Sequence, residues 1–238
     1  MALSLEDRTV VVIGRGSGIA RSIAVAASDA GAHVVVAGRN PDALREAYPD
    51  ERFTTERVDL TDERSIEEFA TRLGTVDHLV STASARARGL LREVDQASVR
   101  LSFDTKVIGP LLLAKHFADR FRAGGSFTLF SGVAAFKPAI GYIGVAITNG
   151  AADFLVRSLA LEMAPVRVNA VSPGVIDTGI WDSLGDEGKA DYFEHFRTHN
   201  PARRIGTVDD IAEAVMFAMT NAFLTGMTLR VDGGEPLT

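Results

Sequence analysis

The stretch TVVVIGRGSGIA, residues 9–20, decides how this chain of 238 residues folds. It opens with five consecutive β-branched residues, Thr9–Ile13, a run typical of a strand buried on both faces of a parallel sheet. Glycines then stand at positions 14, 16 and 18, and a helical pattern follows. Glycine lets the backbone approach a phosphate closely, and a helix N-terminus offers it N–H groups and positive potential. The stretch therefore predicts a strand, a phosphate-binding turn and a helix.

Similar segments continue along the rest of the chain. Buried-strand patterns recur at His33–Ala37, His78–Ser81, Ser126–Phe130, Val166–Val171 and Thr228–Val231. Helical patterns separate them at Ile19–Ala30, Ser65–Leu73, Ser98–Phe121, Gly150–Met163 and Asp209–Met219. This alternation predicts one α/β domain over residues 1–238, with a Rossmann-like, doubly wound parallel sheet flanked by helices.

One long segment, residues 177–206, interrupts the alternation with polar and aromatic residues. Long segments at the carboxyl end of such a sheet often cover a ligand, so we predict a substrate lid here. His195 and His199 stand four residues apart within it. Because the sequence offers no third ligand at a suitable spacing, we predict a solvated helix face and no metal site.

The composition limits the possible partners and location. The net charge is −6 and the basic residues are scattered, so we expect no binding to nucleic acid. No apolar run approaches the ~20 residues of a membrane span. The chain also has no cysteine, which fits a reducing compartment. We therefore expect a cytoplasmic protein that acts on a small-molecule substrate, without membrane or nucleic-acid partners.

Five short motifs resemble those of the short-chain dehydrogenase/reductase family. The turn Gly14–Ala20 resembles the family's G-x-x-x-G-I-G, with Ala20 replacing the last glycine. The others are Asp59-Leu60, Leu79–Ser84 at the place of N-N-A-G, Asn169–Gly174 matching N-x-x-x-P-G, and Val231–Gly234 matching V-D-G-G. Because the motifs span the chain in the family's order, the chain is identified as a member of that family.

The resemblance implies a nicotinamide dinucleotide cofactor, and the residues favour NADP(H). Where NAD-preferring members carry an acidic residue, this chain has Gly38, with Arg39 following and Arg15 in the glycine turn. Two guanidinium groups can bind a 2′-phosphate through charge-assisted hydrogen bonds; alternatively, both are solvated loop residues. The implied cofactor-binding residues are Gly14, Arg15, Ser17, Gly18, Ile19, Arg39, Asp59, Leu60, Ala83, Ser84, Asn149, Pro173, Gly174, Ile176 and Thr178.

The catalytic part of the resemblance is altered. The family uses a serine, a tyrosine, a lysine one helical turn after the tyrosine, and an asparagine on the preceding helix. The strand that ends at Ser131 places Gly132 at the serine position, and counting back from Arg157 gives the same register. Val145 then holds the tyrosine position and Asn149 the lysine position, while Lys106 stands at the asparagine position. The resemblance thus implies an active site without the family's four catalytic residues.

The candidates for the missing chemistry are Lys106, Asn149, Tyr142 and Ser131. Lys106 and Asn149 carry the side chains that the family has in the opposite places, which predicts an exchange that keeps a positive charge near the nicotinamide ribose. Alternatively, Lys106 reaches solvent or pairs with Asp104. Tyr142 stands three residues before Val145, so its hydroxyl could reach the same cavity; alternatively, it is a wall residue.

Three functions remain open at this point. The first is an NADP(H)-dependent oxidoreductase with an altered proton path, acting on a small carbonyl, imine, iminium or conjugated substrate. The second is a cofactor-binding pseudoenzyme or regulatory protein without redox turnover, and the third is a non-redox cyclase or lyase. The helical segments Ser102–Phe121 and Gly150–Met163 are apolar on more than one face, and the family pairs these helices, so we expect a homodimer or homotetramer.

Overall fold

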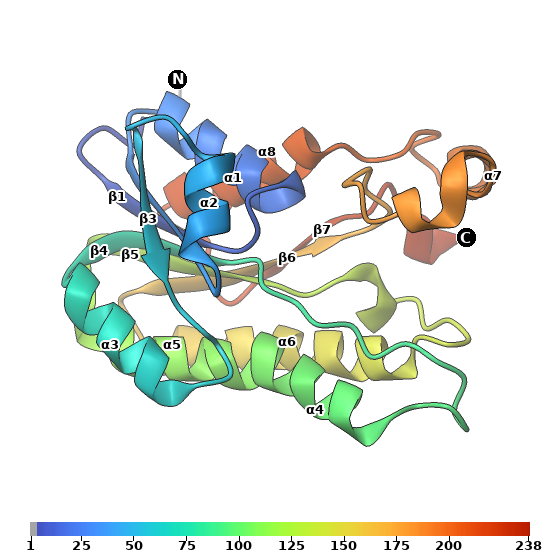
Figure 1. Ribbon diagram of the computed structural model, residues 1–238, viewed down its shortest axis with the longest axis horizontal. Coiled ribbons are helices and arrows are strands. Elements are labelled where there is room, and N and C mark those ends of the chain that lie inside the picture. Colours follow the sequence, from blue (N-terminus) through green and yellow to red (C-terminus); the bar gives the residue numbers. More distant parts are fainter. Residues whose placement is uncertain (1–3) are drawn as a thin grey trace.

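The computed structural model describes residues 4–238, and its centre is a sheet of seven parallel strands. The strands lie in the order β3-β2-β1-β4-β5-β6-β7, so the direction of winding reverses between β1 and β4 (Figure 1). Their bounds are β1 Thr9–Ile13, β2 His33–Gly38, β3 Phe53–Arg57, β4 Val76–Ser81, β5 Phe121–Phe130, β6 Arg167–Pro173 and β7 Thr228–Val231. This order confirms the doubly wound, Rossmann-like class that the alternating pattern predicts.

Helices cover both faces of this sheet. They are α1 Gly18–Asp29, α2 Pro41–Ala47, α3 Glu63–Leu73, α4 Gln96–Phe103, α5 Gly109–Phe117, α6 Ile143–Glu162, α7 Gly185–His199 and α8 Val208–Thr220. The helices α1 and α8 share one hydrophobic core with the sheet, while α3, α5 and α6 form a second core on the other face (Figure 1). Within residues 4–238, none of these helices combines the length and apolar character needed to cross a membrane.

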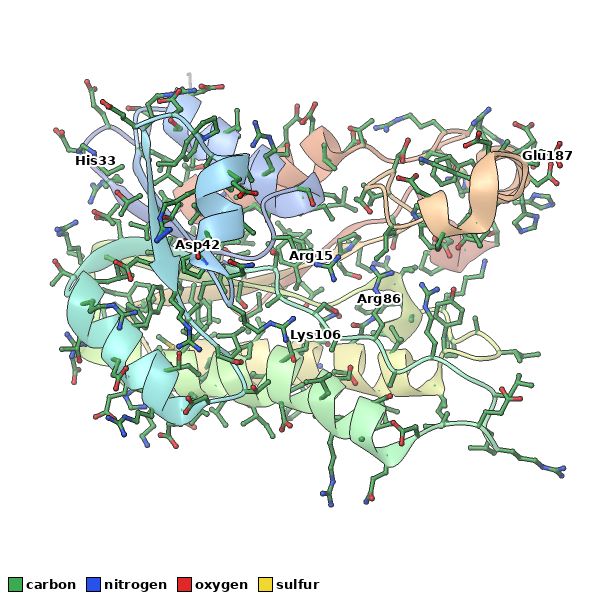
Figure 2. All side chains as sticks on the ribbon, viewed as in Figure 1. Arg15, His33, Asp42, Arg86, Lys106 and Glu187 are labelled. Carbon is green, nitrogen blue, oxygen red and sulfur yellow. The ribbon has the colours of Figure 1, made fainter. Side chains whose placement is uncertain are left out.

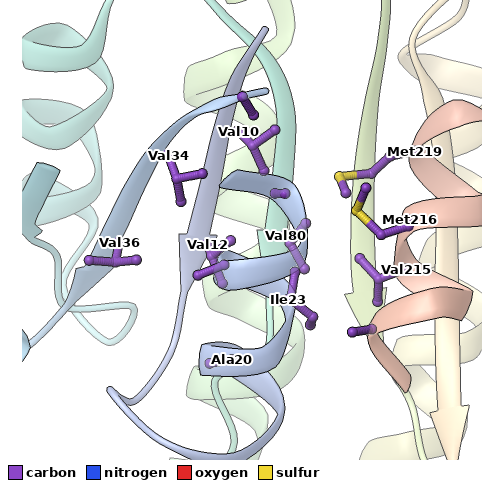
Figure 3. Close-up of a cluster of buried hydrophobic side chains, with 14 of the residues drawn as sticks. Val10, Val12, Ala20, Ile23, Val34, Val36, Val80, Val215, Met216 and Met219 are labelled. Carbon is purple, nitrogen blue, oxygen red and sulfur yellow. The ribbon is translucent and has the colours of Figure 1, made fainter. Parts of the chain in front are cut away.

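The all-apolar sequence of β1 follows from its place between the two cores. Val10 and Val12 pack with Ile23 of α1 and Met216 of α8 (Figure 3). The intervening Val11 and Ile13 face the second core, so every residue from Val10 to Ile13 is buried. Burying each such side chain contributes about 1.5–3 kcal/mol, which fixes β1 in the middle of the sheet.

Some elements differ from those that the sequence pattern predicts. The edge strand β3 alternates between half-buried and exposed residues, so it lacks the continuous apolar run of its neighbours. The short helix α2 begins with Asn40 as its cap and Pro41 in its first turn. The predicted helix at 98–121 is divided into α4, a π-helical turn and α5, and α6 begins seven residues before the predicted Gly150.

Candidate active site

The carboxyl ends of the strands bring most of the predicted site residues together. In a doubly wound sheet, ligands bind outside these ends where the winding reverses, which here is between β1 and β4. Figure 2 shows Arg15, Arg86 and Lys106 gathered in this part of the molecule, between the α1 side and the α4–α6 side. The loop after β1, the loop after β4 and the helical turn between α4 and α5 supply these three residues.

The turn between β1 and α1 has the shape of an anion-binding site. A side chain at Gly14 would collide with the Thr82 hydroxyl, and Gly18 has a φ of +58°, which favours glycine. Ser17 precedes α1 without a hydrogen bond from its side chain to the helix, and the first turn contains no acidic residue. The first N–H groups of α1 are therefore available to a phosphate group.

The end of β2 excludes a carboxylate for a steric reason. A Cβ at Gly38 would lie 2.9 Å from the Gly14 carbonyl oxygen, so a larger residue would push the glycine turn away. The exposed Arg39 follows directly. Burial raises the pKa of Asp59, but hydrogen bonds from Thr61 and the nearby Arg39 and Arg57 charges outweigh this and lower it. Asp59 is thus an ionised turn residue close to Arg39.

The segment after β6 closes over the glycine turn. A Cβ at Gly18 would lie 3.5 Å from the Thr178 Cβ, so the two segments are in contact range. Ile176 is buried, and its carbonyl oxygen accepts a hydrogen bond of 2.8 Å from Trp181 Nε1. On the opposite side, the Thr82 hydroxyl donates to the Ile13 carbonyl oxygen at 3.0 Å, which fixes the start of the loop carrying Ala83 and Ser84. Pro173 ends β6, and Gly174 follows it at the same edge.

A buried polar cluster joins the π-helical turn, the end of β5 and α6. Lys106 lies in the turn Asp104–Ile108, which ends where the Gly109 N–H donates to the Asp104 carbonyl oxygen. Such turns are frequent at functional sites because the extra residue redirects a side chain. Lys106 Nζ donates to the Ser131 carbonyl oxygen at 2.9 Å and to Asn149 Oδ1. Burial and then the Arg86 charge lower the pKa of Lys106 to about 7.

Asn149 is held through both its main-chain carbonyl group and its side-chain amide. Ser131 Oγ donates to the Asn149 carbonyl oxygen at 3.0 Å, so this hydroxyl supports α6. Because Lys106 contacts Asn149 Oδ1, the amide Nδ2 points to the other side, toward Gly132. A Cβ at Gly132 would lie 2.7 Å from this nitrogen. Val145 is half-buried one helical turn before Asn149, on the same side of α6.

Tyr142 lies outside this cluster, among aromatic and basic residues. It precedes α6, and the Arg88 guanidinium carbon lies 4.8 Å from the centre of its ring. The same guanidinium is 5.8 Å from the Trp181 ring, which stacks on Tyr192 at 4.6 Å. Burial, followed by the Tyr142 and Glu235 charges, raises the pKa of Tyr192 to about 12.

The sequence analysis missed Arg86, Arg88 and Tyr192 as site residues. The signal available was the repeated Ala-Arg at positions 85–88, directly after a buried strand that ends at the ligand-binding edge. The resemblance to N-N-A-G ends at Ser84, so it does not predict a role for the two arginines that follow.

The segment 177–206 contains the helix α7 and is tied to its own start by ion pairs. Lys189 Nζ lies 3.0 Å from Asp177 Oδ1 and 2.8 Å from Asp182 Oδ1. The His195 and His199 rings stack at 4.3 Å, and His199 Nδ1 lies 2.7 Å from the His195 carbonyl oxygen. In the part of the chain that the structure describes, no group of three or more acidic, histidine or cysteine side chains could hold a metal.

The fold and this edge define an α/β protein with a dinucleotide-type glycine turn, and comparisons with known proteins specify the family. Residues 13–235 match a family model described as Enoyl-(Acyl carrier protein) reductase. The short-chain dehydrogenase/reductase ucsE of Acremonium sp is 32% identical, over 97% of this chain and 96% of its own length. The chain therefore belongs to the short-chain dehydrogenase/reductase family of oxidoreductases.

Solved structures agree with this family. A small-chain dehydrogenase in complex with NADPH is 30% identical and has a TM-score of 0.85, with 98% of this chain and 100% of that chain covered. The MalC reductase/Diels-Alderase of Malbranchea aurantiaca is 27% identical and has a TM-score of 0.91, with 98% of both chains covered. The similarity to both extends over nearly the whole length of each protein.

Proposed function

We propose that the protein is an NADP(H)-dependent oxidoreductase in which Lys106 and Asn149 replace the family's catalytic tetrad. The substrate is a small, already activated acceptor such as a conjugated carbonyl or an imine. The buried contact between Lys106 Nζ and Asn149 Oδ1 carries this proposal, because it joins the two positions at which the sequence departs from the family. The other two positions, Gly132 and Val145, adjoin the same pair.

The residues at the strand ends fit a bound NADP(H). We assign the pyrophosphate to the N-terminus of α1 at Ser17 and Gly18, which has free N–H groups. Arg15 and Arg39 are assigned to the 2′-phosphate, and Asn149 with residues 173–178 to the nicotinamide ribose and carboxamide. When bound, this cofactor supplies or accepts the hydride. The NADPH complex of the 30% identical dehydrogenase supports the choice of cofactor.

The proposed proton path differs from that of the family because position 145 holds no acid. A valine cannot donate a proton, and general acid–base catalysis typically contributes about 10²–10⁴-fold. We assign Asn149 Nδ2 as the hydrogen-bond donor to the substrate's acceptor atom, since it occupies the space next to Gly132. Such a donor orients and polarises the acceptor, and an activated acceptor needs little more help before hydride arrives.

Lys106 is assigned to hold and polarise Asn149 through Oδ1, the proton that follows the hydride comes from solvent water, and Tyr142 is assigned as a wall residue. Lys106 contacts Asn149 directly, and its pKa of about 7 lets it change protonation state near neutral pH. Tyr142 instead lies beneath Arg88, a position suited to binding. We therefore expect Tyr142→Phe to raise KM and leave kcat largely intact, whereas Lys106→Met lowers kcat.

A substrate screen with purified protein tests the proposal. NADPH consumption is followed at its absorbance band with conjugated aldehydes, conjugated ketones and cyclic imines, and product is quantified in the same samples. Equal amounts of oxidised cofactor and reduced product support the proposal. Tight NADPH binding without consumption of any substrate would show a pseudoenzyme instead.

A non-redox cyclase or lyase is the second candidate. A buried amine with a pKa of about 7 is a suitable base, and one neighbour of high structural similarity is described as both a reductase and a Diels-Alderase. Product that forms in the screen at the same rate without cofactor would establish this function and exclude hydride transfer as the main reaction.

We also propose that residues 177–206 form the substrate lid of this single domain. The support is the contact range between Trp181, which belongs to this segment, and Arg88 from the opposite loop. The aromatic side chains of Trp181, Tyr192 and Phe196 contact one another in tilted pairs, with ring centres 4.6 and 4.8 Å apart. A lid with such a surface would exclude water from the reacting atoms.

A further inference from the structure

We propose that the substrate carries a carboxylate, which Arg86 and Arg88 bind at the mouth of the active site. This inference rests on the proposed function, because it takes the edge beside Lys106 and Asn149 to be where the substrate reacts. Both arginines lie in the loop after β4, and Figure 2 shows Arg86 near Arg15 and Lys106.

Arg86 is an arginine without a protein partner. It forms no hydrogen bond or ion pair within residues 4–238, and its side chain is exposed, so a ligand can reach it. Partial desolvation by nearby protein atoms and the Arg88 charge lower the pKa of Arg86, and the other groups acting on it most strongly are Tyr142, Arg15 and Tyr192. No carboxylate of the protein is among these neighbours, so a positive charge remains unneutralised beside Lys106.

Arg88 is positioned by aromatic rings, not by an acid. Its guanidinium lies 4.8 Å from the centre of the Tyr142 ring and 5.8 Å from that of Trp181. These contacts are cation–π attractions that do not use up the charge of Arg88, and its N–H groups have no hydrogen-bond acceptor within residues 4–238. Arg86 and Arg88, separated by one residue, form a pair of donors suited to a carboxylate.

Several arginines of this protein have an acidic partner, which Arg86 and Arg88 lack. Arg8 and Arg122 both contact Asp77, at 2.8 and 2.7 Å, and Arg204 contacts Asp210. The charge of Glu235 acts on Tyr192, and burial raises the pKa of this glutamate. In a protein with a net charge of −6, a local excess of positive charge at the active site favours an anionic ligand.

Arg88 lies on the substrate side, whereas Arg86 stands between Arg88 and the Arg15 charge. Arg15 lies in the glycine turn itself and is the residue suited to the cofactor. Arg88, in contrast, contacts Tyr142 at the start of α6 and Trp181 of the proposed lid, which are both on the substrate side. The excess positive charge also disfavours a cationic iminium, so the inference narrows the substrate to a carbonyl or neutral imine that bears a carboxylate.

Calorimetric titration of benzoate and benzamide into the protein, with and without NADPH, tests the inference. The two probes share a flat ring that fits the aromatic surroundings, and only benzoate is an anion. We expect benzoate to bind at least tenfold more tightly than benzamide, and Arg86→Gln and Arg88→Gln each to weaken benzoate about tenfold, the loss expected for one charge-assisted hydrogen bond. NADPH affinity should change less than about twofold in both variants.

Arg64→Gln is the matched control, because it removes the same charge from an exposed arginine paired with Glu68 on α3. The inference is overturned if benzoate binds no better than benzamide, or if Arg64→Gln weakens it as much as the other two substitutions. It is also overturned if Arg86→Gln and Arg88→Gln weaken the binding of NADPH and leave the binding of benzoate unchanged. Loss of the proposed function is recognised separately, as failure of the wild-type protein to bind or consume NADPH.

Discussion

Gly132 lies directly beside the side-chain amide of Asn149, so a larger residue at position 132 would displace that amide. The φ of Gly132 is 169°, an extended conformation that any residue adopts. The requirement for glycine is therefore spatial: a Cβ would lie 2.7 Å from Asn149 Nδ2, whose amide is fixed by Lys106. A serine at this position would displace the amide that we assign to the substrate.

We expect Gly132→Ala to lower the free energy of unfolding by about 1–3 kcal/mol, the usual cost of overfilling a packed site. In an Asn149→Ala background the same change should cost much less, because the colliding amide is gone. Urea denaturation of the four proteins measures this coupling. Equal costs in both backgrounds would show that the two side chains do not compete for space.

The lowered pKa of Lys106 makes stability depend on pH in a defined direction. The pKa falls from 10.5 to about 7, so between these values the unfolded chain binds more protons than the folded protein. The free energy of unfolding should therefore rise with pH across this window, and the full penalty applies below pH 7. Denaturation of wild type and Lys106→Met at pH 6.5 and about pH 9.5 isolates this residue. An identical change of the free energy of unfolding with pH in both proteins would contradict this role of Lys106.

Arg39 should determine which nicotinamide cofactor binds. It follows β2 at the place where a carboxylate cannot fit, and it neighbours the ionised Asp59. We expect Arg39→Ala to weaken NADPH about tenfold, as for one lost charge-assisted contact, while NADH changes less than about twofold. Fluorescence titration of both cofactors measures this, and Arg45→Ala on the nearby α2 serves as the control. Equal losses of affinity for the two cofactors would show that Arg39 does not distinguish NADPH from NADH.

At the scale of elements, Lys189 holds the first turns of α7 to the chain that precedes them. Its two ion pairs are partly exposed and together stabilise this segment by up to about 1 kcal/mol. We expect Lys189→Met to speed hydrogen exchange of residues 177–193 by up to about fivefold and to leave α8 unchanged. Hydrogen exchange by mass spectrometry resolves the two regions; equal acceleration in α8 would indicate a global loss of stability.

The sequence predicts an element best where one physical effect dominates it. The strand β1 is buried on both faces, so its run of β-branched residues identifies it directly. The edge strand β3 and the helix α7 are half-exposed, and their patterns resemble those of loops. Spacing along the chain predicts the cluster of Lys106 and Asn149. It does not predict the contacts of Arg88 with Tyr142 and Trp181, because these depend on how distant segments fold together.

At the scale of the whole molecule, one side presents large apolar residues to solvent. They lie along the helices α4 to α6 and the turn between the first two, and comprise Leu101, Ile108, Leu111, Ile147, Phe154 and Leu161, with exposed fractions from 43% to 81%. These helices lie together on one face of the sheet (Figure 1). A contiguous apolar surface of this kind marks an interface, so we propose that two copies pair here as a homodimer, alone or within a homotetramer.

We expect light scattering to give the mass of a dimer or tetramer for the wild type. Leu111→Glu and Phe154→Glu should each shift it toward the mass of one chain, because a buried carboxylate without a partner opposes association. Leu91→Glu, on the exposed loop after β4, is a matched control and should leave the mass unchanged. A wild-type protein with the mass of a single chain would disprove the interface.

The contact between Lys106 and Asn149 also constrains how this protein can change over evolutionary time. An asparagine at both positions still lets one amide donate to the other, whereas two lysines would place two donors and two like charges together. We therefore expect the order in which substitutions arise at these two sites to matter. Descent to or from the family's usual arrangement passes most easily through two amides, so the history of this active site has a preferred direction.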